Sequence, residues 1–205
     1  MRTNLTKTRT AVLAVSAALS LGLSACGSSD PSNLLPPPAA GSSATEAVSA
    51  QHNDADITFI QDMFPHHVGA LAMAQLAPTR AGNADVKALA ARIVNEQDPE
   101  LKRMQEMATA WGVQLQVAGG GAGHSMSGGT SMGMGGDEAK LMPLNGAAFD
   151  RAFLDLMTAH HQSALPMAQA QLDNGQNPQA KELAAAIITA QTAEIAEMKQ
   201  LLTQL

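Results

Sequence analysis

An internal repeat constrains this sequence more than any other feature. When residue n is placed beside residue n+94, positions 56–104 align with positions 150–198 without a gap, and 19 of the 49 pairs are identical. Such a repeat is typical of a structural unit that buries its apolar face only by packing against another copy. We therefore expect the folded part of the chain to consist of two copies of one unit.

The first segment of each copy has the apolar periodicity of a helix. Phe59, Met63, His66, Ala70 and Met73 recur at spacings of four, three, four and three residues, which places them on one helical face. The same spacing recurs 94 residues later in the chain. Each copy is therefore expected to begin with a helix whose inward face is mostly apolar.

A second helix follows in each copy. Its expected first residues are Asn83 in one copy and Asn177 in the other, and Asn177 precedes Pro178. Asparagine is a favoured N-cap, and proline is favoured at the first helical position. Two such hairpins predict an all-α protein, an antiparallel four-helix bundle made of two repeated hairpins.

The composition agrees with a helical core. Four Phe, one Trp and no Tyr make the chain only 2% aromatic, although 45% of its residues are hydrophobic. Strands are enriched in aromatic and β-branched residues, so this composition argues against a sandwich or barrel. A single Cys excludes an internal disulfide and a multi-cysteine zinc site. A net charge of −6 without a basic stripe argues against nucleic-acid binding.

The first 25 residues are predicted to be a secretory signal peptide. Three basic residues precede the apolar run 11–21, which is too short to span a bilayer as a stable helix. Leu23-Ser24-Ala25-Cys26 follows and resembles the bacterial lipobox, in which the cysteine is lipidated. Lipid on Cys26 would anchor the mature protein on the extracytoplasmic face of a bacterial membrane. Loss of the three basic residues would leave 9 basic and 18 acidic residues, a charge of −9.

The rest of the chain divides by composition. Residues 26–51 are rich in Ser, Ala, Gly and Pro and are expected to form a disordered tether. Residues 52–205 are expected to form the bundle, with repeat one at 56–111, a Gly- and Met-rich connector at 117–137, and repeat two at 147–205.

Polar residues interrupt the apolar stripes at corresponding positions in both copies. They form an expected central layer of His, Gln and Glu bordered by methionines: His66, His67, His160, His161, Gln97, Gln191, Glu100 and Glu194. An unpaired buried polar group costs about 1 to 3 kcal/mol, so these side chains need partners. One interpretation is a hydrogen-bonded layer that fixes the bundle register. The other is a metal site, because imidazole suits Zn, Cu, Fe and Ni, and thioether favours Cu(I).

The connector carries further soft donors. Met126, Met132, Met134 and His124 lie in a Gly-rich stretch without apolar periodicity, and Met142 lies just beyond it. One interpretation is a plain spacer. The other is an auxiliary thioether and imidazole arm that captures Cu(I) or passes it to the bundle. Thiols oxidise outside the cytoplasm, so Met and His are the more durable copper ligands there.

These motifs also carry a family resemblance. The run Phe59-x3-Met63-x2-His66-His67-x2-Ala70-x2-Met73-Ala74, followed by Leu89-Ala90-x2-Ile93-x3-Gln97-x2-Glu100-x3-Met104, resembles the bacterial domain-of-unknown-function family 305. A second full set occurs in the other half of the chain, so the resemblance covers about 56–111 and 147–205.

The resemblance implies a ferritin-like bundle that binds copper outside the cytoplasm and contributes to copper tolerance. The ligand candidates that it implies are Met63, His66, His67, Met73, Met104, Met157, His160, His161, Met167 and Met198. Gln97, Glu100, Gln191 and Glu194 are then expected to orient the imidazole rings.

Two other functions are alternatives to copper binding. A di-iron or di-manganese oxidase of ferritin type needs Glu-x-x-His on two helices, but Met63 and Met157 occupy the positions three before His66 and His160. A metal-free structural lipoprotein would leave the histidines hydrogen-bonded only. The favoured hypothesis is a lipid-anchored protein, not an enzyme, that sequesters Cu(I) or Cu(II) or exchanges it with a donor or acceptor protein.

Overall fold

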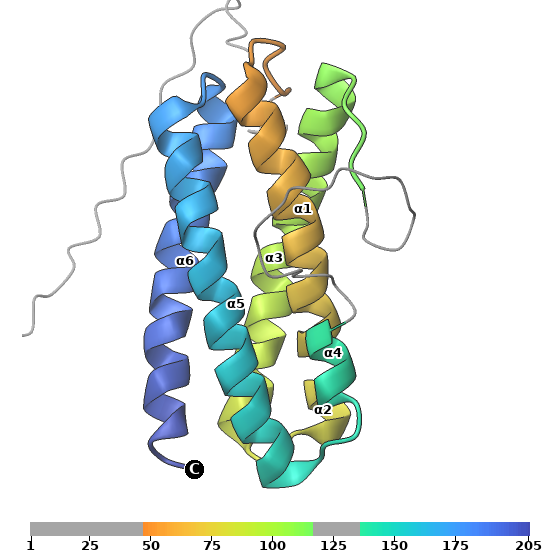
Figure 1. Cartoon of the computed structure of the whole chain (residues 1–205), viewed down its shortest axis with the longest axis vertical. Helices are drawn as coiled ribbons and strands as arrows, with labels where there is room; N and C mark the ends of the chain where they lie inside the picture. Colours follow the sequence, from red (N-terminus) through yellow and green to blue (C-terminus); the bar gives the residue numbers. More distant parts are fainter. Residues whose placement is uncertain (1–46, 117–135) are drawn as a thin grey trace, which may run out of the picture. The chain divides into compact units, whose positions relative to one another are not determined.

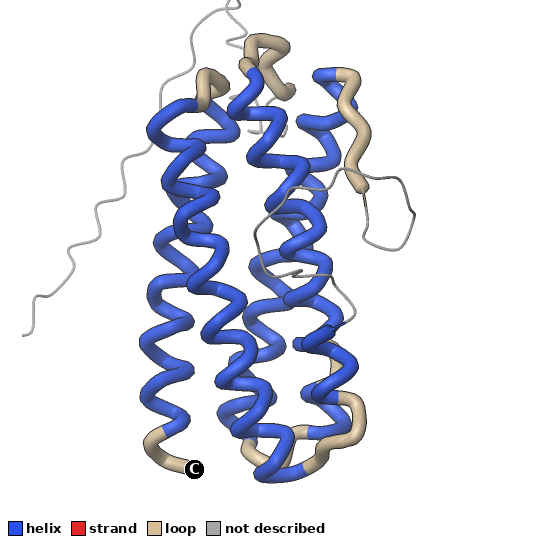
Figure 2. Tube along the Cα trace, viewed as in Figure 1, coloured by secondary structure: helices blue, strands red, loops and turns tan. Residues whose placement is uncertain are grey.

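In the part of the chain that the structure describes, the fold consists of four long helices and two short ones. The computed structural model describes residues 47–116 and 136–205, and these residues are mostly helical (Figures 1 and 2). The helices are α1 (Asp54–Ala74), α2 (Ala77–Arg80), α3 (Ala84–Trp111), α4 (Gly136–Leu141), α5 (Gly146–Asn174) and α6 (Pro178–Leu202). The prediction of an all-α bundle of two helical hairpins is confirmed, with α1 and α3 as one hairpin and α5 and α6 as the other.

Several predicted features lie outside the described residues. These are the signal peptide 1–25, Cys26, most of the tether, and the four connector residues His124, Met126, Met132 and Met134. Within the described parts of the chain, none of the helices combines the length and apolarity needed to cross a bilayer.

Asparagine side chains cap three of the four long helices, α1, α3 and α6, as the sequence predicts for the last two. Asn83 Oδ1 accepts from the backbone N–H of Asp85 at 2.7 Å, and Asn177 Oδ1 accepts from that of Ala180 at 2.9 Å. In α1, Asn53 forms a reciprocal capping box with Asp56. These caps satisfy N–H groups that have no partner within the helix.

Three of the four neighbouring pairs of long helices are closely packed, and the fourth pair, α3 and α6, is not. Helix α1 packs against both α3 and α5, and α5 packs against α6, whereas α3 and α6 make few contacts with each other. The order around the bundle is therefore α3, α1, α5, α6. Equivalent residues of the two repeats lie on α1 and α5 and on α3 and α6.

Two repeat-equivalent aspartates hold the hairpins together. Asp56 in α1 accepts from the backbone N–H groups of Gln176 and Asn177, which directly precede α6. Asp150 in α5 accepts from the N–H groups of Gly82 and Asn83, which directly precede α3. Each carboxylate thus binds the start of a helix in the other hairpin. The two ends of the bundle are therefore closed by the same interaction.

The short helix α4 departs from the expectation of an irregular connector up to residue 137. It begins at Gly136, contains an ion pair between Lys140 and Asp137 at 2.7 Å, and ends at the fully buried Leu141. A six-residue helix with one buried side chain leaves no periodic pattern in the sequence, which is why it escaped prediction.

The last residues assigned to the tether contact the bundle. Ser49 O accepts from Trp111 Nε1 at 3.0 Å, and Gln51 O accepts from Asn177 Nδ2 at 2.8 Å. The ring of His52 stacks on Trp111 with their centroids 4.8 Å apart. This segment therefore covers the end of the bundle at which α1 and α6 begin.

Candidate metal centre

A layer of polar side chains divides the hydrophobic core into two clusters. Along α1, Met63 belongs to one cluster and Met73 to the other, with His66 and His67 between them. On each of the other long helices, the buried hydrophobic residues before the layer belong to one cluster and those after it belong to the other. The polar residues between them are Gln97 and Glu100 in α3, His160 and His161 in α5, and Gln191 and Glu194 in α6. The eight predicted polar residues therefore lie at the same level of the bundle.

Two histidines meet where α1 and α5 pack. The ring centroids of His66 and His160 are 3.7 Å apart, and the ring planes are inclined by 39°. His66 Nε2 lies 2.9 Å from Ser163 Oγ, and that hydroxyl donates its hydrogen to the carbonyl of His160 at 2.7 Å. Because the hydroxyl hydrogen is already engaged, the hydrogen bond with His66 has Nε2–H as the donor.

The other two histidines each bind a glutamate of their own hairpin. His67 Nε2 lies 2.7 Å from Glu100 Oε2, and His161 Nε2 lies 2.8 Å from Glu194 Oε2. Both imidazole side chains are completely buried. A carboxylate only accepts, so Nε2–H is the donor in both pairs. Each of these two rings is therefore held by a hydrogen bond to a glutamate of α3 or α6.

The opposite nitrogen of every ring in this layer lacks a partner. Nδ1 of His66, His67, His160 and His161 is buried and receives no hydrogen bond. In His66, His67 and His161 the ring hydrogen is on Nε2, so a neutral ring carries its lone pair on Nδ1. Metal-binding histidines show this pattern, in which one nitrogen donates to a carboxylate or hydroxyl while the other is free to coordinate.

The environment keeps the facing pair of rings neutral. Burial, followed by repulsion from the other histidines, lowers the pKa of His66 to about 2. The same causes lower the pKa of His160 to about 3. Both side chains are therefore unprotonated at neutral pH. A neutral imidazole is the form that binds a metal ion.

Two glutamines in the layer also lack partners. Gln97 and Gln191 are each 2% exposed, and neither the Nε2 nor the Oε1 atom of either amide is hydrogen-bonded. The expectation that they orient the imidazole rings is therefore wrong as far as direct hydrogen bonds are concerned. Leaving such groups unpaired costs about 1 to 3 kcal/mol each. The layer is consequently rich in polar atoms that a bound ion or water molecules could satisfy.

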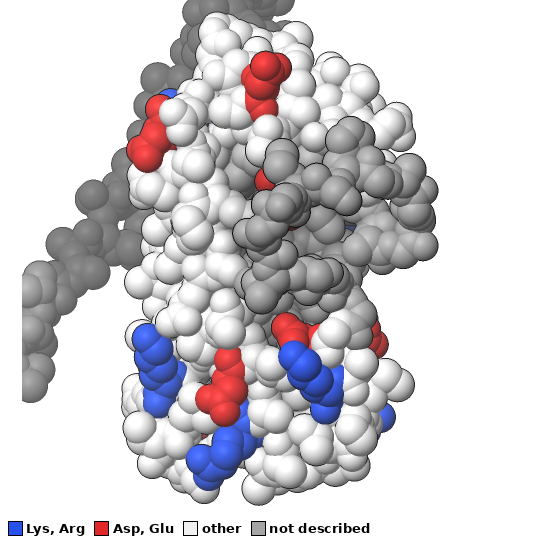
Figure 3. Space-filling view, viewed as in Figure 1, with Lys and Arg blue, Asp and Glu red and all other residues white. Residues whose placement is uncertain are grey.

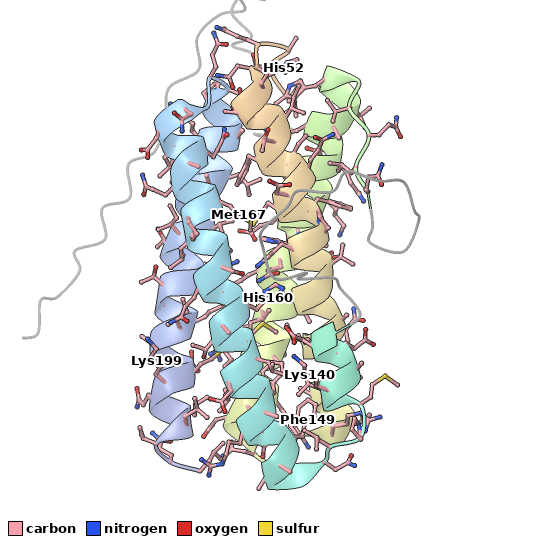
Figure 4. All side chains as sticks on the ribbon, in the orientation of Figure 1. His52, Lys140, Phe149, His160, Met167 and Lys199 are labelled. Atoms are coloured by element: carbon pink, nitrogen blue, oxygen red, sulfur yellow. The ribbon has the colours of Figure 1, made fainter. Side chains whose placement is uncertain are left out.

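Methionines border the layer on both sides. Five of the six predicted thioether ligands are almost fully buried, and these are Met63, Met73, Met104, Met157 and Met198. The sixth, Met167, is half-buried and lies nearer than His160 to the end of the bundle that carries His52 (Figure 4). Met63 and Met157 precede the histidine pairs by three and four residues, which makes them neighbours on the helical face.

The carboxylates and imidazoles alone do not form a complete metal site. In the two described stretches of the chain, no group of three or more His, Cys, Asp and Glu side chains is arranged to hold a metal ion. A site in this layer would therefore combine imidazole with another donor. The thioethers that border the layer supply that donor type.

Two residues of the layer were not predicted. Ser163 fixes the ring of His66, and its repeat equivalent is Gly69, so the repeat itself does not mark this position. Thr158 follows Met157, and its buried hydroxyl oxygen also lacks a partner. Its repeat equivalent is Phe64. Both residues break the repeat at the layer, and that difference was the available signal.

Met142, which lies just beyond the connector, is within the described residues. It is 51% exposed and follows α4 directly. Its thioether therefore faces solvent instead of filling the core.

The fold and the site together define a class of protein: a four-helix bundle of two repeated hairpins, with a buried imidazole layer between methionine-lined clusters. The family match agrees with this class. The chain belongs to the family described as "domain of unknown function (DUF305)", whose sequence profile matches residues 56–202. The resemblance inferred from the sequence motifs is thereby confirmed.

Solved structures of related proteins share the fold. One described as "CopM in the Cu(II)-bound form" is 34% identical, with a TM-score of 0.62, and the match covers 73% of this chain and 96% of that one. CopM structures described as Cu(I)-bound and Ag-bound match over the same share of this chain, at 30% and 29% identity and TM-scores of 0.60 and 0.58.

Two further structures come from named organisms. A DUF305 fragment from Deinococcus radiodurans is 30% identical with a TM-score of 0.63, covering 75% of this chain and 98% of that one. A structure described as a putative secreted DUF305 protein from Streptomyces coelicolor is 28% identical with a TM-score of 0.62, covering 73% and 91%. A comparison with curated proteins found no match.

Proposed function

We propose that this protein binds copper ions in its polar layer and holds them for sequestration or transfer. The observation that carries the proposal is the set of free Nδ1 atoms on His66, His67, His160 and His161. Three of these rings are fixed by hydrogen bonds at Nε2, so the free nitrogens are available without rearrangement of the hydrogen bonds. An imidazole held in this way is a prepared ligand.

The donor types favour copper over harder ions. The layer offers imidazoles, with thioethers on both sides from Met63, Met157 and their neighbours in the core. Thioether is a soft donor that favours Cu(I), and imidazole binds both Cu(I) and Cu(II). Calcium and magnesium prefer oxygen ligands, and the two carboxylates of the layer are already engaged by His67 and His161. CopM structures with Cu(I), Cu(II) and Ag bound support the same choice of ions.

The same ligand set argues for a binding protein over an oxidase. Ferritin-type di-metal oxidases hold their ions with bridging glutamates and a Glu-x-x-His motif. In this chain Met63 and Met157 occupy the positions of the motif glutamates, and both are completely buried. Replacement of two glutamate carboxylates by thioethers lowers the affinity for Fe and Mn. Without such a di-metal centre the oxidase reaction has no site, so we propose that the protein is not an enzyme.

The proposed location is the extracytoplasmic face of a bacterial membrane. The lipobox-like sequence ending at Cys26 supports a lipid anchor, and the Streptomyces coelicolor relative described as a putative secreted protein supports an extracytoplasmic location. The tether that follows Cys26 would let the bundle exchange copper with a donor or acceptor protein.

Metal analysis of the purified protein tests the proposal. After exposure to equimolar Cu(I), Zn(II), Fe(II) and Mn(II) followed by dialysis, we expect copper to be retained above the other ions. Competitive titration of Cu(I) against a chromophoric chelator then gives its affinity. Retention of iron or manganese in preference to copper would favour the oxidase, and retention of no metal would favour the structural lipoprotein.

A further inference from the structure

An open groove runs between α3 and α6, on the side of the bundle opposite the packed α1 and α5 helices. Its volume is about 730 Å³. Four carboxylates line it, from Glu96, Glu100, Glu194 and Glu197. The groove exists because α3 and α6 make few contacts with each other, whereas the other neighbouring long helices are closely packed.

The groove leads directly to the imidazole layer. Glu100 and Glu194 line the groove and also accept hydrogen bonds from His67 and His161. Glu194 is only 6% exposed, and its second oxygen, Oε1, is buried without a partner. In each hairpin one carboxylate therefore connects the solvent-facing groove to the Nε2 side of a buried imidazole ring.

Two unpartnered amides lie in the core next to residues that line the groove. Gln97 directly follows Glu96 and precedes Glu100 by three residues, so it lies beside two residues of the groove while its own side chain is buried. Gln191 is its repeat equivalent in α6 and is buried to the same extent. The two amides offer four unpartnered polar atoms, which could help an ion shed its hydration water.

The groove carries a net negative charge. Its one cationic side chain, among the described lining residues, is Arg92, which is paired with Glu197. Burial, followed by repulsion from Glu194 and Glu100, raises the pKa of Glu96. By contrast, Figure 3 shows few charged side chains over the visible middle of the opposite face, apart from the part that is not described. A cation is therefore attracted to the groove.

The carboxylates of the groove do not form a storage site. In the described residues no three carboxylates or imidazoles are grouped closely enough to hold an ion. Oxygen donors that attract a cation without enclosing it suit a passage toward stronger ligands.

We propose that the groove between α3 and α6 is the port through which a hydrated divalent cation reaches the imidazole layer. This inference rests on the proposed copper-binding function and deepens it. The carboxylates attract the ion, Glu100 and Glu194 meet it at the floor of the groove, and the free ring nitrogens then receive it. Because the attraction is electrostatic, the port controls the rate of loading more than the final affinity.

Stopped-flow loading of the protein with Cu(II) at low ionic strength tests the port. Glu96→Gln removes one negative charge from the groove without touching a histidine or methionine. We expect the loading rate to fall by about three- to tenfold, because a divalent ion loses one attracting charge at close range. Glu182→Gln is the matched control, since it removes one charge from an exposed site on α6 outside the groove. Equal loading rates for the two variants would overturn the proposal.

A second variant obstructs the groove physically. Ala193 is exposed, lines the groove and precedes Glu194, so Ala193→Phe adds a bulky ring to the wall of the groove beside Glu194. Ala170→Phe is the control, an exposed alanine on α5 outside the groove. Circular dichroism verifies that both remain helical. The port predicts slower loading for Ala193→Phe alone, and equal loading by both variants would contradict it.

The equilibrium stoichiometry separates the two proposals. If the wild-type protein binds copper at equilibrium but the groove variants load at the wild-type rate, only the port is wrong. If the wild-type protein takes up no copper at all, both the port and the proposed function are wrong.

Discussion

The rings of His66 and His160, which occupy equivalent positions in the two repeats, face each other with their centroids 3.7 Å apart. Burial is the main cause of the lowered pKa of both side chains; repulsion from His160 adds to it at His66, and repulsion from His161 and His67 adds to it at His160. Duplication of one hairpin thus brings two neutral imidazole rings together where α1 and α5 pack. Both rings have a free Nδ1 atom, which is the observation on which the metal-binding proposal rests.

The glutamates that hold the buried histidines should act on affinity through ring orientation. Glu194→Ala removes the acceptor for His161 Nε2–H. We expect copper affinity to fall by about 10- to 100-fold, as is usual when the partner of a ligating histidine is lost. Glu194→Gln keeps an acceptor and should restore part of the affinity. Competitive titration measures both, and an unchanged affinity in Glu194→Ala would show that ring orientation is unimportant.

The unpartnered glutamines predict a cost to stability in the metal-free protein. Replacing both Gln97 and Gln191 with Leu removes four unsatisfied polar atoms from the core. Apolar replacement of unpaired polar groups is neutral or stabilising, so the free energy of unfolding of the metal-free protein should stay the same or rise. Urea denaturation measures it. A decrease of more than about 1 kcal/mol would mean that ordered water already satisfies these amides.

Because Asp56 links the two hairpins, its contribution to the stability of the fold should depend on pH. Burial raises the pKa of this carboxyl, but hydrogen bonds from Gln171 and from the backbone of Asn53, Gln176 and Asn177 outweigh that effect and hold its pKa below the ordinary value of 3.8. The ionised form is therefore favoured in the folded state. Its stabilising effect is complete above pH 3.8 and is lost as the pH falls through the folded-state pKa.

Asp56→Asn tests this contribution. Because the side chain is fully buried and accepts several hydrogen bonds, we expect a loss of about 1 to 3 kcal/mol at neutral pH. The difference between wild type and variant should shrink below about pH 4. Urea denaturation at pH 7 and pH 3 measures it, and a difference that stays constant with pH would contradict the assignment.

The connector makes a separate prediction about weakly bound copper. Replacing Met126, Met132 and Met134 with Leu removes three thioethers but keeps the length of the chain. We expect fewer weakly held Cu(I) ions in a titration, with the tight site unchanged. A triple variant that titrates like wild type would show that the connector is only a spacer.

Much of this architecture could be predicted from the sequence because the repeat and the helical periodicity are local patterns. The caps at Asn83 and Asn177 and the positions of the histidine pairs are examples. The links made by Asp56 and Asp150 could not, although the two residues are an identical repeat pair. Each binds the start of a helix in the opposite hairpin. That contact depends on how the hairpins pack together, which periodicity does not encode.

The candidate site shows the same limit. Spacing placed the imidazoles in one layer, but it could not reveal which ring nitrogen is free, because that depends on Ser163, Glu100 and Glu194. The groove between α3 and α6 was also invisible in the sequence. It arises from unequal packing among the four helices.

The copper content of a double variant, His66→Ala with His160→Ala, tests the central claim most directly. These substitutions remove two free imidazole nitrogens and leave the His67 and His161 hydrogen bonds in place. His52→Ala is the matched control, because His52 stacks on Trp111 at the end of the bundle and does not belong to the layer. Circular dichroism verifies that all three proteins are equally helical. We predict that the double variant loses tightly bound copper while His52→Ala keeps the wild-type amount; unchanged copper stoichiometry and affinity in the double variant would contradict the account.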